Sequence, residues 1–173
     1  MRVYEIPEGS KNSKGRAMQN LINIEQDDRV KAFICTQDLK DEEYVNSNYV
    51  IMATKMGQVK KTSLEQYSRP RSNGINAITI KDDDELLEAK LTNGNSQIML
   101  AVKSGKAIRF EESKTRPMGR NASGVRGIRL KDNKDEVVGM ISVNDMDANI
   151  LVVSENGFGK RSSLEDYRLT NRG

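Results

Sequence analysis

The stretch that decides the fold is Gly57-Gln58-Val59-Lys60-Lys61-Thr62-Ser63-Leu64-Glu65-Gln66-Tyr67, because the chain repeats it as Gly157-Phe158-Gly159-Lys160-Arg161-Ser162-Ser163-Leu164-Glu165-Asp166-Tyr167. A more diverged copy runs Gly105-Lys106-Ala107-Ile108-Arg109-Phe110, so the three glycines are separated by 48 and 52 residues. Repeats with a period of about 50 residues are typical of propellers and solenoids, in which no unit can bury its apolar face without its neighbours. The sequence therefore predicts an array of stacked units.

The repeats predict a single domain over residues 1–173, with approximate repeats at 1–47, 48–95, 96–147 and 148–173, of which the first and last are partial. Apolar or alternating runs predict strands at residues 1–6, 30–35, 49–54, 59–62, 75–80, 86–92, 97–102, 107–110, 137–143 and 149–154. Gly57 is expected in a turn, because glycine adopts positive φ without a Cβ clash. Residues 63–67 are expected to make one helical turn, and residues 37–48 a surface loop. Since helical periodicity is almost absent, the predicted fold class is all-β, a propeller-like array of four-stranded blades.

The composition excludes several classes of protein. The chain has 173 residues and no apolar run near the length of a membrane span, and its first residues do not resemble a secretory signal. Cys35 is the only cysteine, which fits a reducing cytoplasm, and we expect it to be a small buried side chain. The chain has no histidine, so classical hydrolase triads are excluded and the usual zinc ligand is missing.

Charge alternates along the chain in phase with the repeats. Residues 103–129 carry eight Lys and Arg against two glutamates, whereas residues 131–147 carry five acids against two lysines. A basic position also recurs at the same point of each hairpin, at Lys60-Lys61, Arg109 and Lys160-Arg161, where period-two alternation should send one residue of each pair outward. Charge in phase with a repeat places one sign on one rim of the assembly.

Two interpretations of these cations are open. A stripe of lysine and arginine along successive blades is the pattern expected for a duplex held by its phosphates. The alternative is that the basic residues only protect edge strands from pairing with other chains. The chain has no Trp, three Phe and five Tyr, so contact with a duplex backbone is favoured over base stacking on single strands.

Other patterns predict no further site. The acidic clusters at residues 82–84 and 132–135 lack the spacing of a calcium loop, so we interpret them as turns and expect no metal site. The glycine-bearing stretch 119–127 lacks a Walker lysine and a following helix, so a nucleotide phosphate loop is not expected.

Several motifs in order resemble one known family. Gly124-Val125-Arg126-Gly127-Ile128-Arg129-Leu130, Gly157-Phe158-Gly159-Lys160-Arg161, Leu64-Glu65-Gln66-Tyr67 and Val3-Tyr4-Glu5-Ile6-Pro7-Glu8 resemble the carboxy-terminal DNA-wrapping domain of the A subunit of bacterial DNA gyrase. The resemblance covers essentially the whole chain. It implies a β-pinwheel, a propeller-like ring of about six blades that exchange strands, of which this chain would form an incomplete ring of roughly three to three and a half blades.

The resemblance also implies a function. In that family the domain wraps duplex DNA around a basic outer rim, which lets an ATP-dependent topoisomerase, an isomerase of DNA topology, introduce negative supercoils. The DNA-binding residues it implies here are Lys60, Lys61, Arg69, Arg71, Arg109, Arg116, Arg120, Arg126, Arg129, Lys160 and Arg161. The family's basic box, of the type Gln-Arg-Arg-Gly-Gly-Lys-Gly, has no full match in the chain.

The resemblance places the catalytic tyrosine and the ATP and Mg sites in other domains or in the partner subunit. It therefore implies no catalytic residue, metal or cofactor in this chain. The implied partners are duplex DNA, the rest of the gyrase A subunit, and the gyrase B subunit, in the bacterial cytoplasm at the nucleoid and not at a membrane. Two alternatives stay open: the similar domain of the topoisomerase IV A subunit, and a β-propeller that binds proteins.

Overall fold

The computed structural model describes residues 1–22, 24–25, 28–71 and 73–173, and the chain divides into two compact units, Met1–Val30 and Lys31–Gly173. The first unit contains two short 3₁₀ helices, η1 (Val3–Glu5) and η2 (Met18–Asn20). The strand predicted at residues 1–6 is therefore wrong. The N–H of Arg2 instead donates to the Glu5 carboxylate at 2.7 Å, which closes a local turn where no paired strand is formed.

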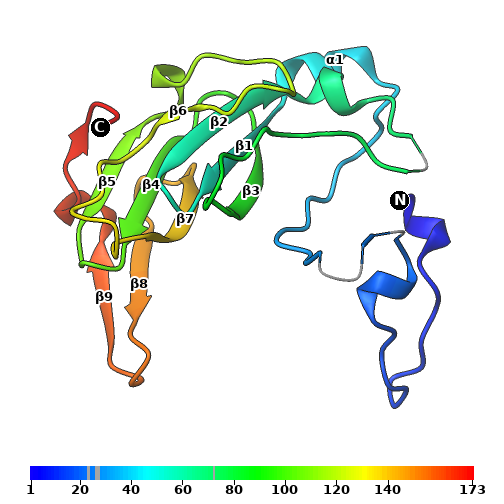
Figure 1. Cartoon of the computed structure of the whole chain (residues 1–173), viewed down its shortest axis with the longest axis horizontal. Coiled ribbons are helices and arrows are strands. Elements are labelled where there is room, and N and C mark those ends of the chain that lie inside the picture. Colours follow the sequence, from blue (N-terminus) through cyan, green and yellow to red (C-terminus); the bar gives the residue numbers. More distant parts are fainter. Residues whose placement is uncertain (23, 26–27, 72) are drawn as a thin grey trace. The chain divides into compact units, whose positions relative to one another are not determined.

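The second unit is built from three sheets (Figure 1). The first sheet has the order β3 (Leu86–Thr92), β1 (Tyr49–Thr54), β2 (Gln58–Ser63), β6 (Val125–Arg126). The second has the order β10 (Leu169–Thr170), β5 (Ala107–Glu111), β4 (Gln97–Val102), β7 (Val137–Val143). The third is the hairpin of β8 (Asn149–Val153) and β9 (Gly159–Ser163).

Each four-stranded sheet is completed by a strand from the following repeat. β6 follows β5 in the chain, yet it pairs with β2 of the preceding repeat, and β10 follows β9 yet pairs with β5. The parallel pairing of β10 with β5 has a counterpart one repeat earlier, where Pro117 bridges Lys61 in parallel as Leu169 pairs with Arg109. The predicted all-β pinwheel is thus confirmed, including the exchange of strands between units.

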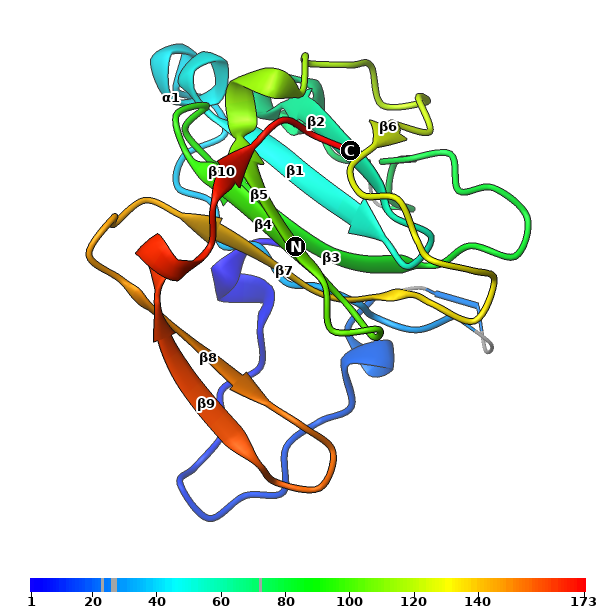
Figure 2. The same cartoon turned by 90° about the vertical axis from the view of Figure 1, so that its left-hand side faces the viewer.

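The apolar core lies between the first and second sheets, where β3 and β7 are in contact (Figure 2). Ile51 and Val59 of the first sheet join Ile98, Leu100 and Phe110 of the second in one buried cluster. A second cluster covers the opposite face of the first sheet and includes residues of β1 together with the helix α1 (Glu42–Ser47). The first sheet therefore has apolar packing on both faces.

The helix α1 corrects the surface loop expected at residues 37–48. Asp41 caps it by accepting hydrogen bonds from the N–H groups of Glu43 and Tyr44 at 3.0 and 3.2 Å, and Val45 is buried against the first sheet. The Asp41 cap and the packing of Tyr44 and Val45 hold this short helix against the sheet.

Two more predicted strands are wrong, and one residue expected to be buried is exposed. Residues 30–35 and 75–80 have no strand hydrogen-bonding pattern, and Cys35 is exposed. The segment 75–80 lies instead against the loop of the next repeat, where Thr79 donates its hydroxyl to the Asn121 carbonyl at 2.7 Å. Contacts to an irregular loop replace the ladder that a strand would need.

The glycine turns and the helical turns are where the repeat predicts them. Gly57, Gly105 and Gly157 have φ of 82°, 86° and 81° between the paired strands of their hairpins. The predicted helical turn is the 3₁₀ helix η3 (Leu64–Tyr67), and equivalent turns, η4 (Glu112–Lys114) and η5 (Leu164–Asp166), follow β5 and β9.

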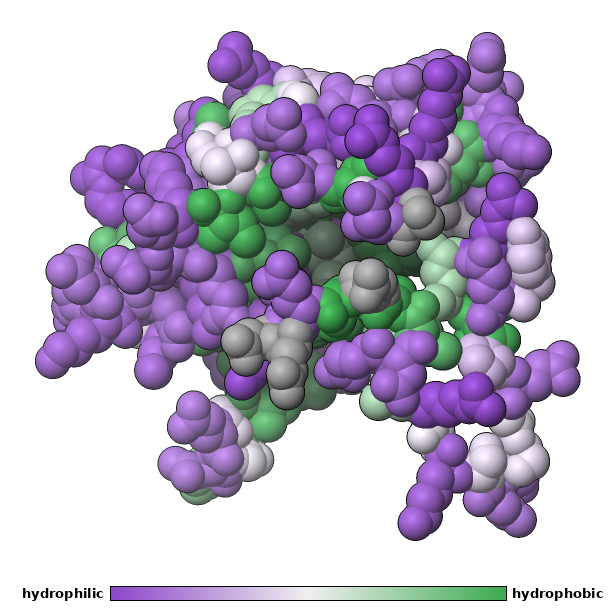
Figure 3. Space-filling view, turned by 45° about the vertical axis from the view of Figure 1, so that its right-hand side comes forward, coloured by the Kyte–Doolittle hydropathy of each residue, from purple (hydrophilic) through white to green (hydrophobic). Residues whose placement is uncertain are grey.

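The surface in Figure 3 is mostly hydrophilic, as expected for a chain with 28 Lys and Arg and 25 Asp and Glu. Within the described residues, no helix is both long enough and apolar enough to span a bilayer.

Candidate nucleic-acid interface

The outer edge of the first sheet is formed by residues 117–129, here called the docking segment, which belong to the next repeat. Two glycines allow it to lie against β2. A Cβ on Gly124, whose φ is 94°, would come within 2.6 Å of the Val59 carbonyl oxygen, and one on Gly127 within 2.3 Å of a Val59 methyl carbon. The Gly127 N–H donates to the Gly57 carbonyl at 2.8 Å. The motif around residues 124–129 is therefore the sequence that docks one repeat on another.

The arginines of this motif face away from the docked side. Arg126 and Arg129 are exposed, as is Arg116 just before the docking segment, while Arg120 is half-buried. Since Gly124 and Gly127 hold the backbone against β2, the Arg126 side chain between them projects into solvent. The structure thus brings four predicted cations onto one sheet edge.

Three arginines from two repeats surround one hollow of about 480 Å³. Arg69 and Arg71 come from the connection after η3, and Arg120 comes from the docking segment. The Arg120 N–H donates to the Gln66 side-chain oxygen at 3.1 Å, and Glu65 is the one acid among the described residues that line the hollow. A polar hollow with three guanidinium groups is suited to phosphate oxygens, because each guanidinium can offer paired N–H donors.

A second hollow of about 670 Å³ near the Gly57 turn has mixed charge. Arg126, Arg129, Lys81 and Lys131 line it together with three aspartates: Asp82, Asp84 and Asp132. The acids offset part of the positive potential there. The end of the edge near η3 and Arg120 is therefore the more cationic part.

Lys60 and Lys61 do not lie on the outer surface, which corrects the expectation that one of the pair points outward. Lys60 has 0% of its surface exposed, and its ammonium donates to the carbonyls of Ala77 and Arg120. The Lys61 ammonium lies 2.9 Å from the buried Glu112 carboxylate. Alternation fails here because the first sheet is covered on both faces, so consecutive residues of β2 are both buried.

The remaining predicted cations are dispersed. Arg109 is half-buried on β5, and its buried Nε has no hydrogen-bond partner among the described residues. Lys160 and Arg161 are exposed on β9, in the third sheet. Their hairpin position matches that of Lys60 and Lys61, but no docking segment covers it in the described chain.

One cation missed by the sequence reasoning is Arg168. It is exposed two residues after the end of η5, just as Arg69 lies two residues after η3 and Arg116 two residues after η4. An exposed arginine thus comes shortly after the helical turn in three successive repeats, and Figure 1 shows these turns one after another along the same edge of the second unit. The signal was present in the chain, since the Leu-Glu-x-Tyr repeat fixes the register and Arg168 follows its tyrosine.

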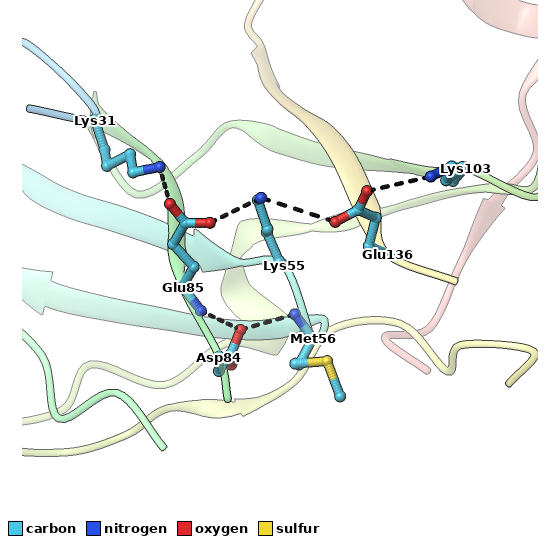
Figure 4. A network of polar contacts seen from close by, with 7 residues as sticks. All are labelled: Lys31, Lys55, Met56, Asp84, Glu85, Lys103 and Glu136. Carbon is cyan, nitrogen blue, oxygen red and sulfur yellow. Dashed lines mark hydrogen bonds and ion pairs between the residues drawn. The ribbon is translucent and has the colours of Figure 1, made fainter. Parts of the chain in front are cut away.

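The opposite end of the hairpins carries a chain of alternating charge (Figure 4). Glu85 pairs with Lys31 and, at 2.7 Å, with Lys55, which also lies 3.8 Å from Glu136 of the next repeat. Glu136 lies 3.7 Å from Lys103. Lys55 therefore joins two repeats, although its 38% exposed side chain limits the strength of the link.

The acidic clusters hold the glycine turns. Asp84 accepts from the N–H of Met56 at 2.9 Å, and Asp135 accepts from the N–H and the hydroxyl of Ser104, both at 2.9 Å. Burial opposes ionisation of Asp135, but these bonds and one from the Lys131 N–H outweigh it and lower its pKa. The described residues include no group of three or more His, Cys, Asp or Glu placed to hold a metal ion.

The fold and the periodic arginines define a strand-exchanging, propeller-like domain with a cationic edge. The family model of the DNA gyrase C-terminal domain, beta-propeller, matches residues 1–37, 48–93, 97–144 and 148–173. The chain belongs to this family.

Similar proteins agree with this assignment. The DNA gyrase A subunit of Staphylococcus epidermidis is 44% identical over 174 residues, which cover 100% of this chain and 19% of that protein. The Staphylococcus aureus protein of the same name is 43% identical over 175 residues, with the same coverage. This chain spans about a fifth of the length of these relatives.

Two solved structures have the same fold. The C-terminal domain of DNA topoisomerase IV superposes with a TM-score of 0.86 at 29% identity, covering 98% of this chain and 51% of that one. A DNA gyrase A C-terminal domain gives 0.80 at 25% identity, covering 100% of this chain and 53% of that one. The chain therefore matches about half of each solved domain.

Proposed function

We propose that this chain binds duplex DNA along the outer edge of its sheets and bends it. The observation that carries the proposal is the recurrence of an exposed arginine after each helical turn, at Arg69, Arg116 and Arg168. Cations that recur from one repeat to the next suit a polyanion, which presents phosphates along its whole length. The arginines of the docking segment, with Arg71, extend this edge between the turns.

Contact through phosphates has two consequences. Affinity falls with salt, by about 0.9 in log K per neutralised phosphate for each log unit of salt concentration. Sequence preference is weak and follows how easily the duplex bends, as in other proteins that bend DNA without reading base edges.

The family membership supports a larger role. We propose that the chain is a DNA-wrapping part of the gyrase A subunit, where it assists negative supercoiling in the bacterial cytoplasm, at the nucleoid. Its partners would be the rest of that polypeptide together with the gyrase B subunit. In this proposal strand cleavage, ATP and Mg belong to other parts of the enzyme, and this chain supplies only the DNA-bending surface.

A second candidate is the corresponding domain of topoisomerase IV, which is favoured by the TM-score of 0.86 to that domain. The 44% identity to the gyrase A subunit over the whole chain favours gyrase. The two candidates differ in the assay of the full-length protein with its partner subunit. Negative supercoiling of relaxed DNA supports gyrase, whereas decatenation without supercoiling supports topoisomerase IV.

The test of DNA binding is charge reversal at Arg120 and Arg126 together. We expect the variant to bind a mixed-sequence duplex at least about tenfold more weakly at low salt, and the salt slope to fall by about 1.8, for two lost phosphate contacts. The matched control is charge reversal at Lys106 and Lys134, which are exposed and lie outside the proposed surface. Equal affinity of the two variants, measured by fluorescence anisotropy, would contradict the proposal.

The same titration separates DNA binding from protein binding. A protein-binding propeller would show no salt-dependent affinity for bulk duplex, and its partner would not be displaced by DNA.

A further inference from the structure

The buried ammonium of Lys60 joins two segments that carry the proposed DNA-binding arginines. It donates to the carbonyl of Ala77, 17 residues away, and to the carbonyl of Arg120, 60 residues away. The Tyr67 hydroxyl donates to the same Ala77 carbonyl at 3.2 Å. Ala77 lies in the connection between η3 and β3, which also carries Arg69 and Arg71, so one side chain contacts both segments that supply arginines to the hollow.

A cation at this position is not needed for packing. The equivalent residue of the next hairpin is Ile108, which packs against the apolar core. Lys60 also differs from its neighbour Lys61, whose charge is paired with the Glu112 carboxylate, because both bonds of Lys60 go to neutral carbonyls. A buried charge without a counter-ion is unfavourable unless its hydrogen bonds compensate.

The surroundings of Lys60 make its charged form less favourable than it is in water. Burial, and secondly the charge of Arg120, lowers its pKa to about 8. The titratable groups described around it are Tyr67, whose pKa burial raises, and Arg120. Near neutral pH the side chain is therefore an ammonium with strong donors, and its acceptors are the two loop carbonyls.

We propose that Lys60 is a positioning residue, which ties the connection between η3 and β3 to the docking segment so that Arg69, Arg71 and Arg120 are arranged around one hollow before DNA arrives. This inference rests on the proposed function. Thr79 adds two further bonds between the same segments, from its hydroxyl to Asn121 and from its N–H to Ala122 at 3.3 Å. Ordering the arginines in advance strengthens binding, because the duplex need not fix two loose loops.

A positioning residue and a direct phosphate contact have different salt dependence. Removal of a contact lowers the salt slope, since one fewer counterion is released. Removal of Lys60 leaves all the guanidinium groups available, so affinity falls while the slope is kept. We expect Lys60→Met to weaken duplex binding about tenfold, the factor that corresponds to one hydrogen bond from a charged group.

The experiment compares wild type, Lys60→Met, Lys60→Arg and the control Lys106→Met, which removes one exposed lysine charge. Duplex affinity is measured over a range of salt, and hydrogen exchange is followed at the Thr79 amide. Lys60→Met should bind duplex more weakly, with an unchanged salt slope and faster exchange at the Thr79 amide. Lys60→Arg should regain part of the affinity and part of the protection of Thr79 from exchange. The control Lys106→Met should resemble wild type. Circular dichroism confirms that each variant is folded.

The outcomes separate this inference from the proposed function. If wild type does not bind duplex, the proposed function fails, and the Thr79 exchange rate alone decides whether Lys60 ties the two segments. If wild type binds and a folded Lys60→Met binds equally well, the inference is wrong and the proposed function stands. The inference is also wrong if Lys60→Met binds duplex more weakly but keeps the wild-type exchange rate at the Thr79 amide, or if its salt slope is lower. In either case Lys60 would act through its charge and not by tying the two segments.

Discussion

Replacing Lys61 by methionine tests the correction that most changes the candidate site. The Lys61 and Glu112 side chains are 5% and 0% exposed, and their charged atoms lie 2.9 Å apart. After the change, the hydrogen-bond donors left to the Glu112 carboxylate among the described residues are the Thr92 hydroxyl at 2.7 Å and the Ser96 N–H at 3.3 Å. Breaking one side of a buried ion pair destabilises a protein by about 3–5 kcal/mol.

The loss of a cation–π contact adds to this effect. The Lys61 ammonium lies 4.1 Å from the centre of the Tyr49 ring, a contact that contributes about 1 kcal/mol. We therefore expect the free energy of unfolding to fall by about 4 kcal/mol. With a urea m-value of about 2 kcal/mol/M, the midpoint followed by circular dichroism should fall by about 2 M.

The double variant Lys61→Met with Glu112→Gln provides the control. It leaves no charge at this site, and the amide can replace both bonds, because its oxygen can accept from the Ser96 N–H while its NH2 donates to the Thr92 hydroxyl, so the double variant should regain about 2 kcal/mol or more of the loss. Its net charge equals that of wild type, so its affinity for duplex DNA should also equal that of wild type. A loss below about 1 kcal/mol for the single variant, or no recovery in the double variant, would refute the buried-pair account.

Three further changes test other parts of the fold. Gly124 has a positive φ, and Gly124→Ala places a Cβ 2.6 Å from the Val59 carbonyl oxygen, so this change should lower the free energy of unfolding by about 2 kcal/mol or more. Gly119 has open space around it, so Gly119→Ala should change the free energy of unfolding by about 0.5 kcal/mol at most. Equal urea midpoints for the two variants would contradict this. Burial lowers the pKa of Lys60 from 10.5 to about 8 in the folded chain. Between about pH 8 and pH 10.5, Lys60 is therefore mostly protonated in the unfolded chain and mostly neutral in the folded chain. The contribution of Lys60 to the free energy of unfolding therefore rises with pH in that window. The free energy of unfolding of wild type relative to that of Lys60→Met should increase between pH 7 and about pH 9.5. If the difference between the two proteins does not change with pH, the pKa of Lys60 is not lowered. Lys55→Met should cost about 1 kcal/mol, less at high salt, and Lys103→Met should cost less still, because its side chain is more exposed. A salt-independent loss at Lys55 would indicate lost packing and not a lost ion pair.

The hairpins could be predicted from the sequence because their signals are local. Residues 49–62 and 97–110 combine apolar runs with a glycine turn, and both form the expected strand pairs. The two-residue strand β6 could not be predicted, since so short a run has no periodicity and its partner β2 belongs to another repeat. The motif around Gly124 was found only through its resemblance to the gyrase family, and the close approach to Val59 supplies its physical reason.

The candidate site was predicted less well than the fold. Charge runs identify which residues are basic, but exposure depends on which faces of a sheet are covered. The first sheet is covered on both faces, so Lys60 and Lys61 are buried. The DNA contacts of the exposed cations stay predictions, as do the limits of the four repeats.

The docking segment links the stacking of the repeats to the spacing of the cations. Gly124 and Gly127 fix how closely one repeat approaches the β2 strand of the previous one, and Arg120 and Arg126 belong to the same few residues. Any change that alters the angle between repeats must therefore also move the arginines relative to those of the preceding turn. For a rigid, regularly spaced polyanion such a change lowers affinity even when every cation is kept. Stability of the junction and DNA binding should accordingly fall together in junction variants, whereas surface arginine variants should lose binding alone.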